Sequence, residues 1–533
     1  MSVSQSQRLD RSSSTNHSLL SDSSEGSVAD EVQRLNEDVI EQMLQEDDAI
    51  AGNTIMRTLT SRDRDEEAPE PPPTPLQRRR STIVESIKST GAYQKIAKMG
   101  FWDSDFKKQR ANIYITFLKN YIILALIFSI ALSVMWGTYH KRENYYHNMK
   151  ILVVNDDQQV NGVAPIVGQS VNYTAFQVPG IHAIGAWRVF DHDAFAPQAA
   201  KHNNTFKEEA IRLVHHQKYW AAIYIPENIT YHLYTAIQNN DTSFNLTGQI
   251  EVLYETGRDL VSVSSYVVTF CQQFEEAFVQ VIKGQYGTLV NSFDSNEDKL
   301  STLRWLAAPP TFVFTDMRPA AAILAAPFQL GLSYLVVFTF FQMLMTIRIQ
   351  IYLASVVHGA KFILVKVLVS QLSYLTLAAS FVVLNVTFKI DVTSAFGHSG
   401  GLVLLAVAYL LIGSLGTLNE IAATILFTYY PPLIGGWVVL LMAFNVAPTT
   451  SPMALTYPFY RYGYAMPIHN AFELVKVVFC NTYKGQMGRN IGILFVWIVW
   501  TNIALPFVLL HVSKVRAKRE KRAKEKAEAE QAK

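Results

Sequence analysis

The sequence predicts a polytopic α-helical membrane protein, with about six transmembrane helices and an α/β extracytoplasmic domain between the first helix and the other five. The first observation is a set of six apolar runs, each near the roughly 20 residues that a helix needs to cross a bilayer core. The second is a long segment of mixed composition, residues 140–325, that separates the first run from the rest. The third is the placement of basic residues beside the runs.

The N-terminal region is predicted to be a disordered cytoplasmic tail. Residues 1–106 are rich in Ser, Asp, Glu, Arg and Pro and contain few aromatic side chains. Such a composition cannot bury enough apolar surface to offset the entropy lost on ordering. No apolar run opens the chain, so no cleavable signal peptide is expected. Within this tail Ser81 follows three arginines and is a candidate phosphorylation site.

The apolar runs divide into a first span at residues 120–139 and a five-helix bundle at residues 326–512. A buried helix of a soluble protein could imitate any one run, but six in one chain argue against that alternative. The fifth run is short enough to be a half-span. The runs lie at residues 121–139, 327–345, 366–388, 401–421, 432–447 and 491–511.

Basic residues predict the orientation of these spans. Lys and Arg accumulate in cytoplasmic flanks, and they stand before the first span, after the second, and in the basic cytoplasmic tail at residues 513–533. The flanking residues that carry this signal are Lys107, Lys108, Arg110, Lys119, Arg348, Lys361 and Lys366. Six crossings would place both termini in the cytoplasm and residues 140–325 outside it.

The segment between the first and second runs also holds glycosylation sequons. Five Asn-x-Ser/Thr patterns fall between residues 172 and 247, which indicates a glycosylated ectodomain. Asn385 matches the pattern but lies in the third span, so we expect it to stay unmodified. The candidate glycosylation sites are Asn172, Asn203, Asn228, Asn240 and Asn245.

The same segment has the pattern of a folded α/β domain. Runs rich in Val, Ile and Tyr predict strands at 150–156, 219–226 and 248–257. Helical patterns at 164–171, 206–218 and 259–290 lie between and after them, which favours a small mixed sheet covered by helices. The histidines of this domain are irregularly spaced, so we expect surface histidines and no metal site.

The chain holds two cysteines, Cys271 and Cys480, and both fall on the predicted outer side. A disulfide between them is one expectation where the compartment oxidises. Two unpaired buried thiols are the alternative and the default.

No catalytic or nucleotide-binding motif is present. The sequence lacks G-x-x-x-x-G-K-[ST], H-E-x-x-H and G-x-S-x-G. We therefore predict no enzyme, no catalytic residue and no cofactor, and no ATPase of its own.

Polar residues near the spans are the candidate functional groups. Asn419 and Glu420 lie at the inner end of the fourth span, where a carboxylate at membrane depth is expensive unless it is paired. One interpretation makes Glu420 functional, and the other makes it a solvated residue at the headgroup level. Both remain open from the sequence.

Residues 457–480 are predicted to be an outer amphipathic segment that lies at the membrane interface. After Pro467, apolar residues recur at helical spacing, while His469, Glu473 and Lys476 form a polar stripe at i, i+4 and i+7. A cluster of tyrosines precedes them, as in aromatic belts at headgroup level. Arg461 within this cluster would bind a lipid phosphate or serve as an anchor.

Several segments resemble the family of the fungal nitrosoguanidine-resistance membrane protein. The clearest is "FYRYGYAMPIHNAFELVKVVFCNTYKGQMGRNIGILFVWIVW", and the resemblance covers roughly residues 105–512. The other segments lie at 130–157, 316–342 and 414–447. The family looks like a divergent branch of the membrane subunits of type-2 ABC exporters. The resemblance implies fungal origin, a link to resistance against toxic compounds, and a plasma membrane or another secretory-pathway membrane.

Two classes of function follow. In the first, the protein takes part in export of drugs or in lipid transport and asymmetry, with membrane lipids as partners. A homodimer and a separate energy-supplying partner belong to this interpretation, and no nucleic acid does. In the second, the protein is a non-transporting membrane organiser or sensor that acts through partners.

Overall fold

The computed structural model describes residues 101–102, 104–239, 241, 244, 246–291, 310–357 and 359–531. The described residues fall into two compact units, one that ends at Phe128 and one that begins at Ser129. The predicted tail 1–106 therefore lies outside the described residues except for its last few, and so does Ser81.

Helix α4, Lys107–Gly137, contains the first predicted span. The helix begins 13 residues before the predicted start at residue 120, and its first residues are the basic flank that precedes the apolar run. A short 3-10 turn, Ser104–Phe106, precedes it.

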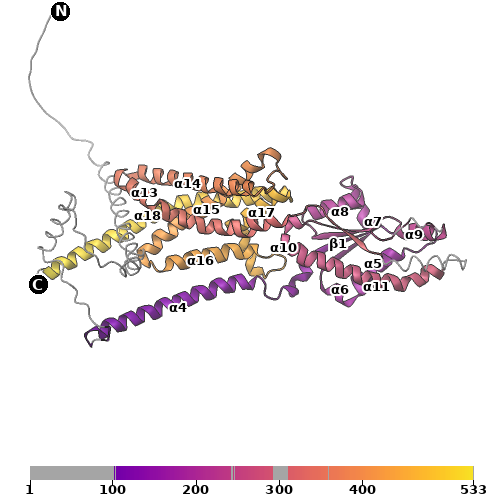
Figure 1. Ribbon diagram of the computed structural model, residues 1–533, viewed down its shortest axis with the longest axis horizontal. Helices are drawn as coiled ribbons and strands as arrows, with labels where there is room; N and C mark the ends of the chain where they lie inside the picture. The colour runs from indigo at the N-terminus through magenta and orange to yellow at the C-terminus, as the bar shows by residue number, and fades with distance from the viewer. Residues whose placement is uncertain are drawn as a thin grey trace, which may run out of the picture. The chain divides into compact units, whose positions relative to one another are not determined.

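The predicted α/β domain contains a five-stranded mixed sheet, which we call the sheet domain (Figure 1). Its strand order is β2-β1-β3-β4-β5, with β1 parallel to both neighbours and β4 antiparallel to β3. The predicted strands 150–156, 219–226 and 248–257 are confirmed as β1, β3 and β4. The strand bounds are β1 Lys150–Asn155, β2 Ala186–Asp191, β3 Ala221–Ile225, β4 Ile250–Tyr254 and β5 Phe312–Asp316.

Helices cover both faces of this sheet. Ile151 and Val153 of β1 join one apolar core with α5 and α11, while Leu152 and Val154 join a second core with α8. Successive strand residues point to opposite faces, so a strand buried on both faces is continuously apolar. The helices are α5 Ile166–Gln177, α6 Pro179–Ala183, α7 His192–Ala200, α8 Phe206–His215, α9 Ile229–Gln238, α10 Leu260–Ser262 and α11 Thr269–Asn291.

The second half of the chain forms a helical bundle. Five of the described helices, α4 included, are long and apolar enough to cross a membrane. The predicted fifth span is the 14-residue helix α16, which is shorter than a bilayer crossing. The bundle helices are α13 Leu332–Val356, α14 Gly359–Thr387, α15 Gly400–Tyr429, α16 Leu433–Val446, α17 Pro467–Cys480 and α18 Met487–Gln531.

Helix α16 nevertheless returns the chain toward the sheet domain. The α15 helix ends near the basic end of α18, where Arg519 Nη1 donates to the carbonyl of Thr428 at 2.6 Å. After α16, Thr450 Oγ1 lies 3.0 Å from the hydroxyl of Thr138, just before the sheet domain. The predicted basic tail 513–533 continues helix α18, which extends through Gln531 without interruption.

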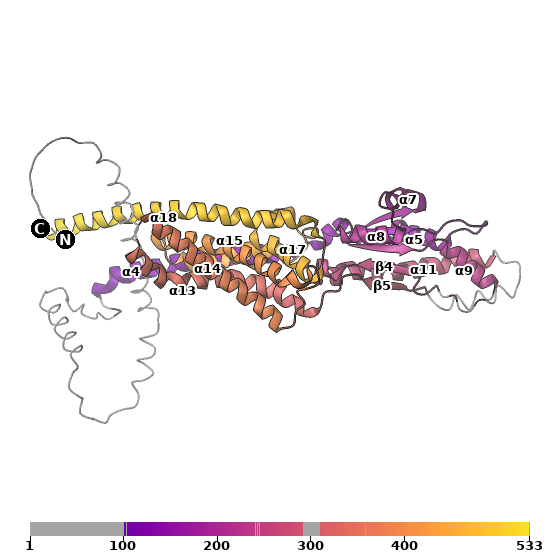
Figure 2. The same ribbon diagram turned by 90° about the horizontal axis from the view of Figure 1, so that it is seen from above.

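Helix α17 lies where the bundle meets the sheet domain (Figure 2). The prediction of a helix over this segment is confirmed, but the helix packs within the protein, and only the tyrosine cluster before it is exposed in part. Twelve of its residues are buried, including His469 and Lys476 of the polar stripe. The apolar face packs into the bundle core, and the polar stripe faces the sheet domain.

Candidate functional site

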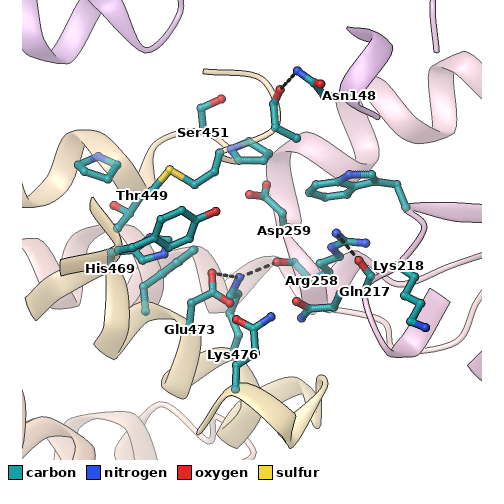
Figure 3. Close-up of a pocket in the computed structure, with 18 of the residues that line it drawn as sticks. Asn148, Gln217, Lys218, Arg258, Asp259, Thr449, Ser451, His469, Glu473 and Lys476 are labelled. Atoms are coloured by element: carbon teal, nitrogen blue, oxygen red, sulfur yellow. Dashed lines mark hydrogen bonds and ion pairs between the residues drawn. The ribbon is translucent and has the colours of Figure 1, made fainter. Parts of the chain in front are cut away.

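A cavity of about 380 Å³ lies between the sheet domain and α17, and we call it the junction pocket (Figure 3). Three parts of the chain meet there: the sheet domain, the loop after α16, and α17 with the start of α18. Its lining comprises Asn148, Lys150, His216, Gln217, Lys218, Trp220, Arg258, Asp259, Pro448, Thr449, Ser451, Pro452, Met453, Ala454, Tyr464, His469, Phe472, Glu473, Lys476, Gln486 and Arg489.

The polar stripe of α17 forms one wall of the junction pocket. Pro467 occupies the first turn of the helix, where its missing N–H costs no hydrogen bond. From there His469, Glu473 and Lys476 project from one face, as their spacing predicts. Lys476 Nζ donates to Glu473 Oε1 at 2.7 Å and to the backbone carbonyl of Arg258 at 2.9 Å. The stripe therefore ties the bundle to the sheet domain.

Arg258 supplies the opposite wall. Its guanidinium lies 3.6 Å from the centre of the Trp220 ring, a cation–π contact. Nη1 also donates to the carbonyl of Tyr219 at 2.7 Å. Burial lowers the pKa of Arg258 to about 10, so the side chain remains charged at neutral pH.

Two carboxylates face the same space. Burial opposes ionisation of Glu473, but Lys476, His469 and Arg258 together hold the pKa of this carboxyl below its ordinary value. Asp259 Oδ1 accepts a hydrogen bond from the Ser262 amide at 2.7 Å. Burial raises the pKa of Asp259, although Lys476 opposes the rise. Figure 3 shows the Asp259 carboxyl directed into the open part of the pocket.

The junction pocket carries an excess of positive charge. Five basic side chains line it against two acidic ones, Asp259 and Glu473, which leaves an excess of three. Within the described chain, Lys150, Lys218 and Arg489 form no ion pair with a carboxylate and are exposed. The five basic residues are Lys150, Lys218, Arg258, Lys476 and Arg489. Such a pocket favours a ligand with negative charge.

Two polar side chains on the bundle side are buried. Ser451 is 3% exposed, and its Oγ has no hydrogen-bond partner among the residues that the structure describes. A buried hydroxyl without a partner costs free energy, so a ligand or water that accepts from or donates to Ser451 would be stabilised there. Burial lowers the pKa of His469, which keeps its imidazole neutral at neutral pH.

Arg461 does not belong to this pocket. It lies on an eight-residue 3-10 segment, Pro458–Ala465, and is exposed. The neighbouring Tyr460 is buried and donates its hydroxyl to the carbonyl of Val134 at 2.8 Å. Tyr457 is 60% exposed, so the tyrosine cluster divides between structural packing and the surface.

Glu420 lies in a second polar cluster, inside the bundle. It is 3% exposed, accepts a hydrogen bond from Ser370 Oγ at 2.7 Å and lies 3.8 Å from Lys366 Nζ. The interpretation of Glu420 as a solvated headgroup-level residue is therefore wrong. Lys366, which was expected to mark a cytoplasmic flank, is itself buried beside this carboxylate.

Asn419 connects three helices in that cluster. Its Nδ2 donates to Thr339 Oγ1 of α13, and its Oδ1 accepts from Trp437 Nε1 of α16, both at 2.9 Å. Helix α15 thus contacts α13 and α16 through Asn419 and α14 through Glu420. Both groups fix helix packing, as buried polar residues in membrane bundles do.

The two cysteines are free, buried thiols in different cores. Cys271 packs in the sheet domain, and Cys480 lies against Gly257 at the end of α17. The predicted disulfide is therefore not formed, and the alternative of two buried thiols describes the structure. Burial raises the pKa of both thiols, that of Cys480 to about 11.

Three of the predicted sequons are described, at Asn172, Asn203 and Asn228, whereas Asn240 and Asn245 lie outside the described residues. Asn203 is exposed in a turn, and Asn228 precedes helix α9. Throughout the described residues, no group of three or more His, Cys, Asp or Glu side chains could hold a metal ion.

The sequence did not reveal the sheet-domain half of the pocket. Arg258 and Asp259 stand between β4 and α10, within a charged Gly-Arg-Asp turn. The one local feature that could have suggested a site is an arginine followed by an aspartate at the junction between a strand and a helix. Nothing in local spacing relates it to α17, more than 200 residues later.

Similarity to known proteins identifies the family. No solved structure matches the chain. An uncharacterized endoplasmic reticulum membrane protein of Saccharomyces cerevisiae is 30% identical over 431 residues, which are 78% of this chain and 83% of the yeast protein. This relative and the apolar helices show a membrane protein. Neither description names nitrosoguanidine resistance or an exporter, so both stay predictions. The family model "Protein of unknown function (DUF3533)" matches residues 120–503, and the chain belongs to that family.

Proposed function

We propose that this protein takes part in the movement of lipids or amphiphilic toxic compounds across its membrane, and that the junction pocket receives the polar end of the cargo. The observation that carries the proposal is the excess of positive charge in a cavity at one end of the helical bundle. Membrane lipids with a phosphate headgroup present matching negative charge at the ends of membrane-spanning helices.

The bundle surface supports an amphiphilic cargo. An apolar groove of about 700 Å³ lies between α13 and α14. Each of the five long helices holds an 18-residue stretch with no more than two charged side chains. The buried carboxylate of Glu420 is paired with Lys366, so it is not a free ion-binding group. These features favour lipid handling over ion-coupled transport.

The topology proposed here has six crossings, with α16 and the turn after it as the fifth. Both termini then lie in the cytoplasm, and the sheet domain lies outside it. The relative in the endoplasmic reticulum membrane supports a secretory-pathway membrane, with the plasma membrane as a further destination. A homodimer and a separate energy-supplying partner complete an export role that resembles type-2 ABC exporters and is linked to drug resistance.

The test is lipid translocation in reconstituted vesicles. Full-length protein is placed in liposomes with a fluorescent short-chain phospholipid, and dithionite reports the rate at which the lipid changes leaflet. We expect the wild-type protein to accelerate translocation. Replacing the three unpaired basic residues, Lys150, Lys218 and Arg489, by glutamine is expected to slow it severalfold, because the headgroup loses its counter-charges.

The control carries three exposed basic residues elsewhere in the sheet domain, Arg188, Lys201 and Lys283, each replaced by glutamine. It should translocate lipid as the wild type does. A second measurement follows efflux of a preloaded alkylating compound from cells that lack the protein or carry either variant. No translocation and equal efflux in every case would overturn the proposal and leave a non-transporting organiser or sensor.

A further inference from the structure

Among the described residues, the junction pocket contains both basic and acidic side chains that form no ion pair, and they lie in different parts of it. Lys150 and Lys218 belong to the sheet domain, and Arg489 lies at the start of α18. All three are exposed and lack an ion pair within the described part of the chain. Together they can bind a phosphate, for which lysine and arginine are suitable donors.

Asp259 provides a negative charge within the same space. Its Oδ1 accepts from the backbone amide of Ser262, and no ion pair among the described residues includes it. Figure 3 shows the carboxyl directed into the cavity. A purely anionic ligand would be repelled by this carboxylate, so the occupant has to offer a cation or a hydrogen-bond donor there.

Ser451 gives an independent indication of a ligand. It lines the same pocket, is 3% exposed, and its hydroxyl has no partner in the portion of the chain that the structure describes. A hydroxyl oxygen accepts hydrogen bonds from an ammonium group. In the described part of the chain, Asp259 therefore forms no ion pair and the Ser451 hydroxyl has no hydrogen-bond partner, so both can accept from a ligand.

The aromatic side chains distinguish a primary ammonium from a quaternary one. A quaternary group needs free aromatic faces around it. Arg258 covers the Trp220 ring, which is only 8% exposed. Arg489 lies 5.6 Å from the centre of the Tyr464 ring. With these faces occupied, the cavity favours an ammonium that donates hydrogen bonds.

We infer that the junction pocket recognises the headgroup of an aminophospholipid: Asp259 and Ser451 accept from its primary ammonium, and Lys150, Lys218 and Arg489 bind its phosphate. The inference rests on the proposed function and names the class of lipid. Phosphatidylethanolamine and phosphatidylserine carry both groups, phosphatidylcholine lacks the donor hydrogens, and phosphatidylglycerol lacks the cation.

The experiment measures binding of water-soluble dihexanoyl phospholipids to full-length protein in a neutral detergent, by microscale thermophoresis. We expect the ethanolamine and serine lipids to bind about tenfold more tightly than the choline lipid, the value of one charge-assisted hydrogen bond. The variant Asp259→Asn keeps the cap on Ser262 but loses the charge. It is expected to abolish this preference while binding the glycerol lipid as well as, or better than, the wild type.

The control is Asp193→Asn, an exposed aspartate on α7 outside the pocket, which should keep the preference. If Asp259→Asn weakens the binding of all four lipids equally, the residue is merely structural and the inference is overturned.

If the wild type binds all four lipids alike, the recognition of the amine is overturned. The proposed function then stands provided that the triple glutamine variant weakens the binding of all four. If that variant changes nothing, both are overturned. If glycerophosphoethanolamine, which has no acyl chains, binds as tightly as the ethanolamine lipid, the ligand is a soluble molecule and the inference of a lipid is overturned.

Discussion

The surroundings of the Glu420 side chain decide whether its buried charge stabilises or destabilises the bundle. Its carboxylate has the Lys366 ammonium at 3.8 Å and hydrogen bonds from Ser370 and Tyr374, all on α14. A buried carboxylate with these partners holds two helices together, whereas an unpaired one at the same depth would cost several kcal/mol. The Glu420–Lys366 pair therefore stabilises the packing of α14 against α15.

The variant Glu420→Ala is expected to lower the free energy of unfolding by roughly 3 kcal/mol, because it leaves the Lys366 ammonium buried without its partner. The double variant with Lys366→Met should recover much of that loss, since neither charge remains. Thermal unfolding in detergent micelles measures both, with the exposed Glu276→Ala as the control. Equal losses in the single and double variants would show that the charge pair is not the cause.

Local geometry also separates the candidate glycosylation sites. We expect a glycan on Asn203, which is exposed in a turn at φ 55°. We expect none on Asn228, because Thr230 of its sequon is 1% exposed and donates to Asp157 at 2.6 Å. Expression in eukaryotic cells with endoglycosidase treatment should show one mobility step lost in Asn203→Gln and none in Asn228→Gln. The opposite pattern would contradict the assignment.

At the scale of elements, α15 is the central helix of the bundle. It packs against α13, α14, α16, α17 and α18, and over half of its residues are buried. A glycine at residue 416 lets the Tyr374 ring of α14 lie directly against its backbone. Small residues of this kind allow close approach of helices in membranes, where packing provides much of the association energy.

The variant Gly416→Ala is expected to destabilise the bundle by about 1–3 kcal/mol, since a Cβ there would overlap the Tyr374 ring. Gly435→Ala in α16 is the matched control, because a Cβ there meets nothing within 4 Å. That control should be neutral or slightly stabilising, as alanine has the higher helix propensity. Unfolding temperatures in the same detergent compare the two, and equal temperatures would contradict the packing argument.

At the scale of the whole molecule, the junction couples the sheet domain to the bundle. Lys476 bridges Glu473 and the Arg258 carbonyl, and Asn148 Nδ2 donates to the Ala454 carbonyl at 3.1 Å. His216 packs on Tyr483, with ring centres 4.6 Å apart. Because both halves line the pocket, a ligand bound there would contact both of them.

The junction also predicts a pH dependence of stability. Glu473 has a pKa below its ordinary value in the folded protein, so the unfolded chain binds more protons near that pH. Its contribution is present above the ordinary pKa near 4.5 and is lost as the pH falls through the lowered value. Unfolding temperatures of wild type and Glu473→Gln should differ at pH 7 and converge below pH 4.5. Parallel curves would contradict this assignment.

The sequence contained the elements that local pattern specifies. Five apolar runs became long helices, and the continuous Val and Ile runs became β1, β3 and β4. The spacing of His469, Glu473 and Lys476 predicted one face of α17 correctly. Strands β2 and β5 were missed, because they are only partly buried, and Arg188 in β2 breaks its apolar pattern.

By itself, then, the sequence determined a membrane protein with a mixed sheet and the polar face of α17, because periodicity is a property of neighbours along the chain. Only the tertiary structure decided what that face meets. It brought Arg258 and Asp259 to α17, placed Lys366 beside Glu420, and put the two cysteines in separate cores. These contacts join residues that lie tens to hundreds of positions apart. No local spacing encodes them, so the pocket and its charge emerge only when the helices and the sheet pack together.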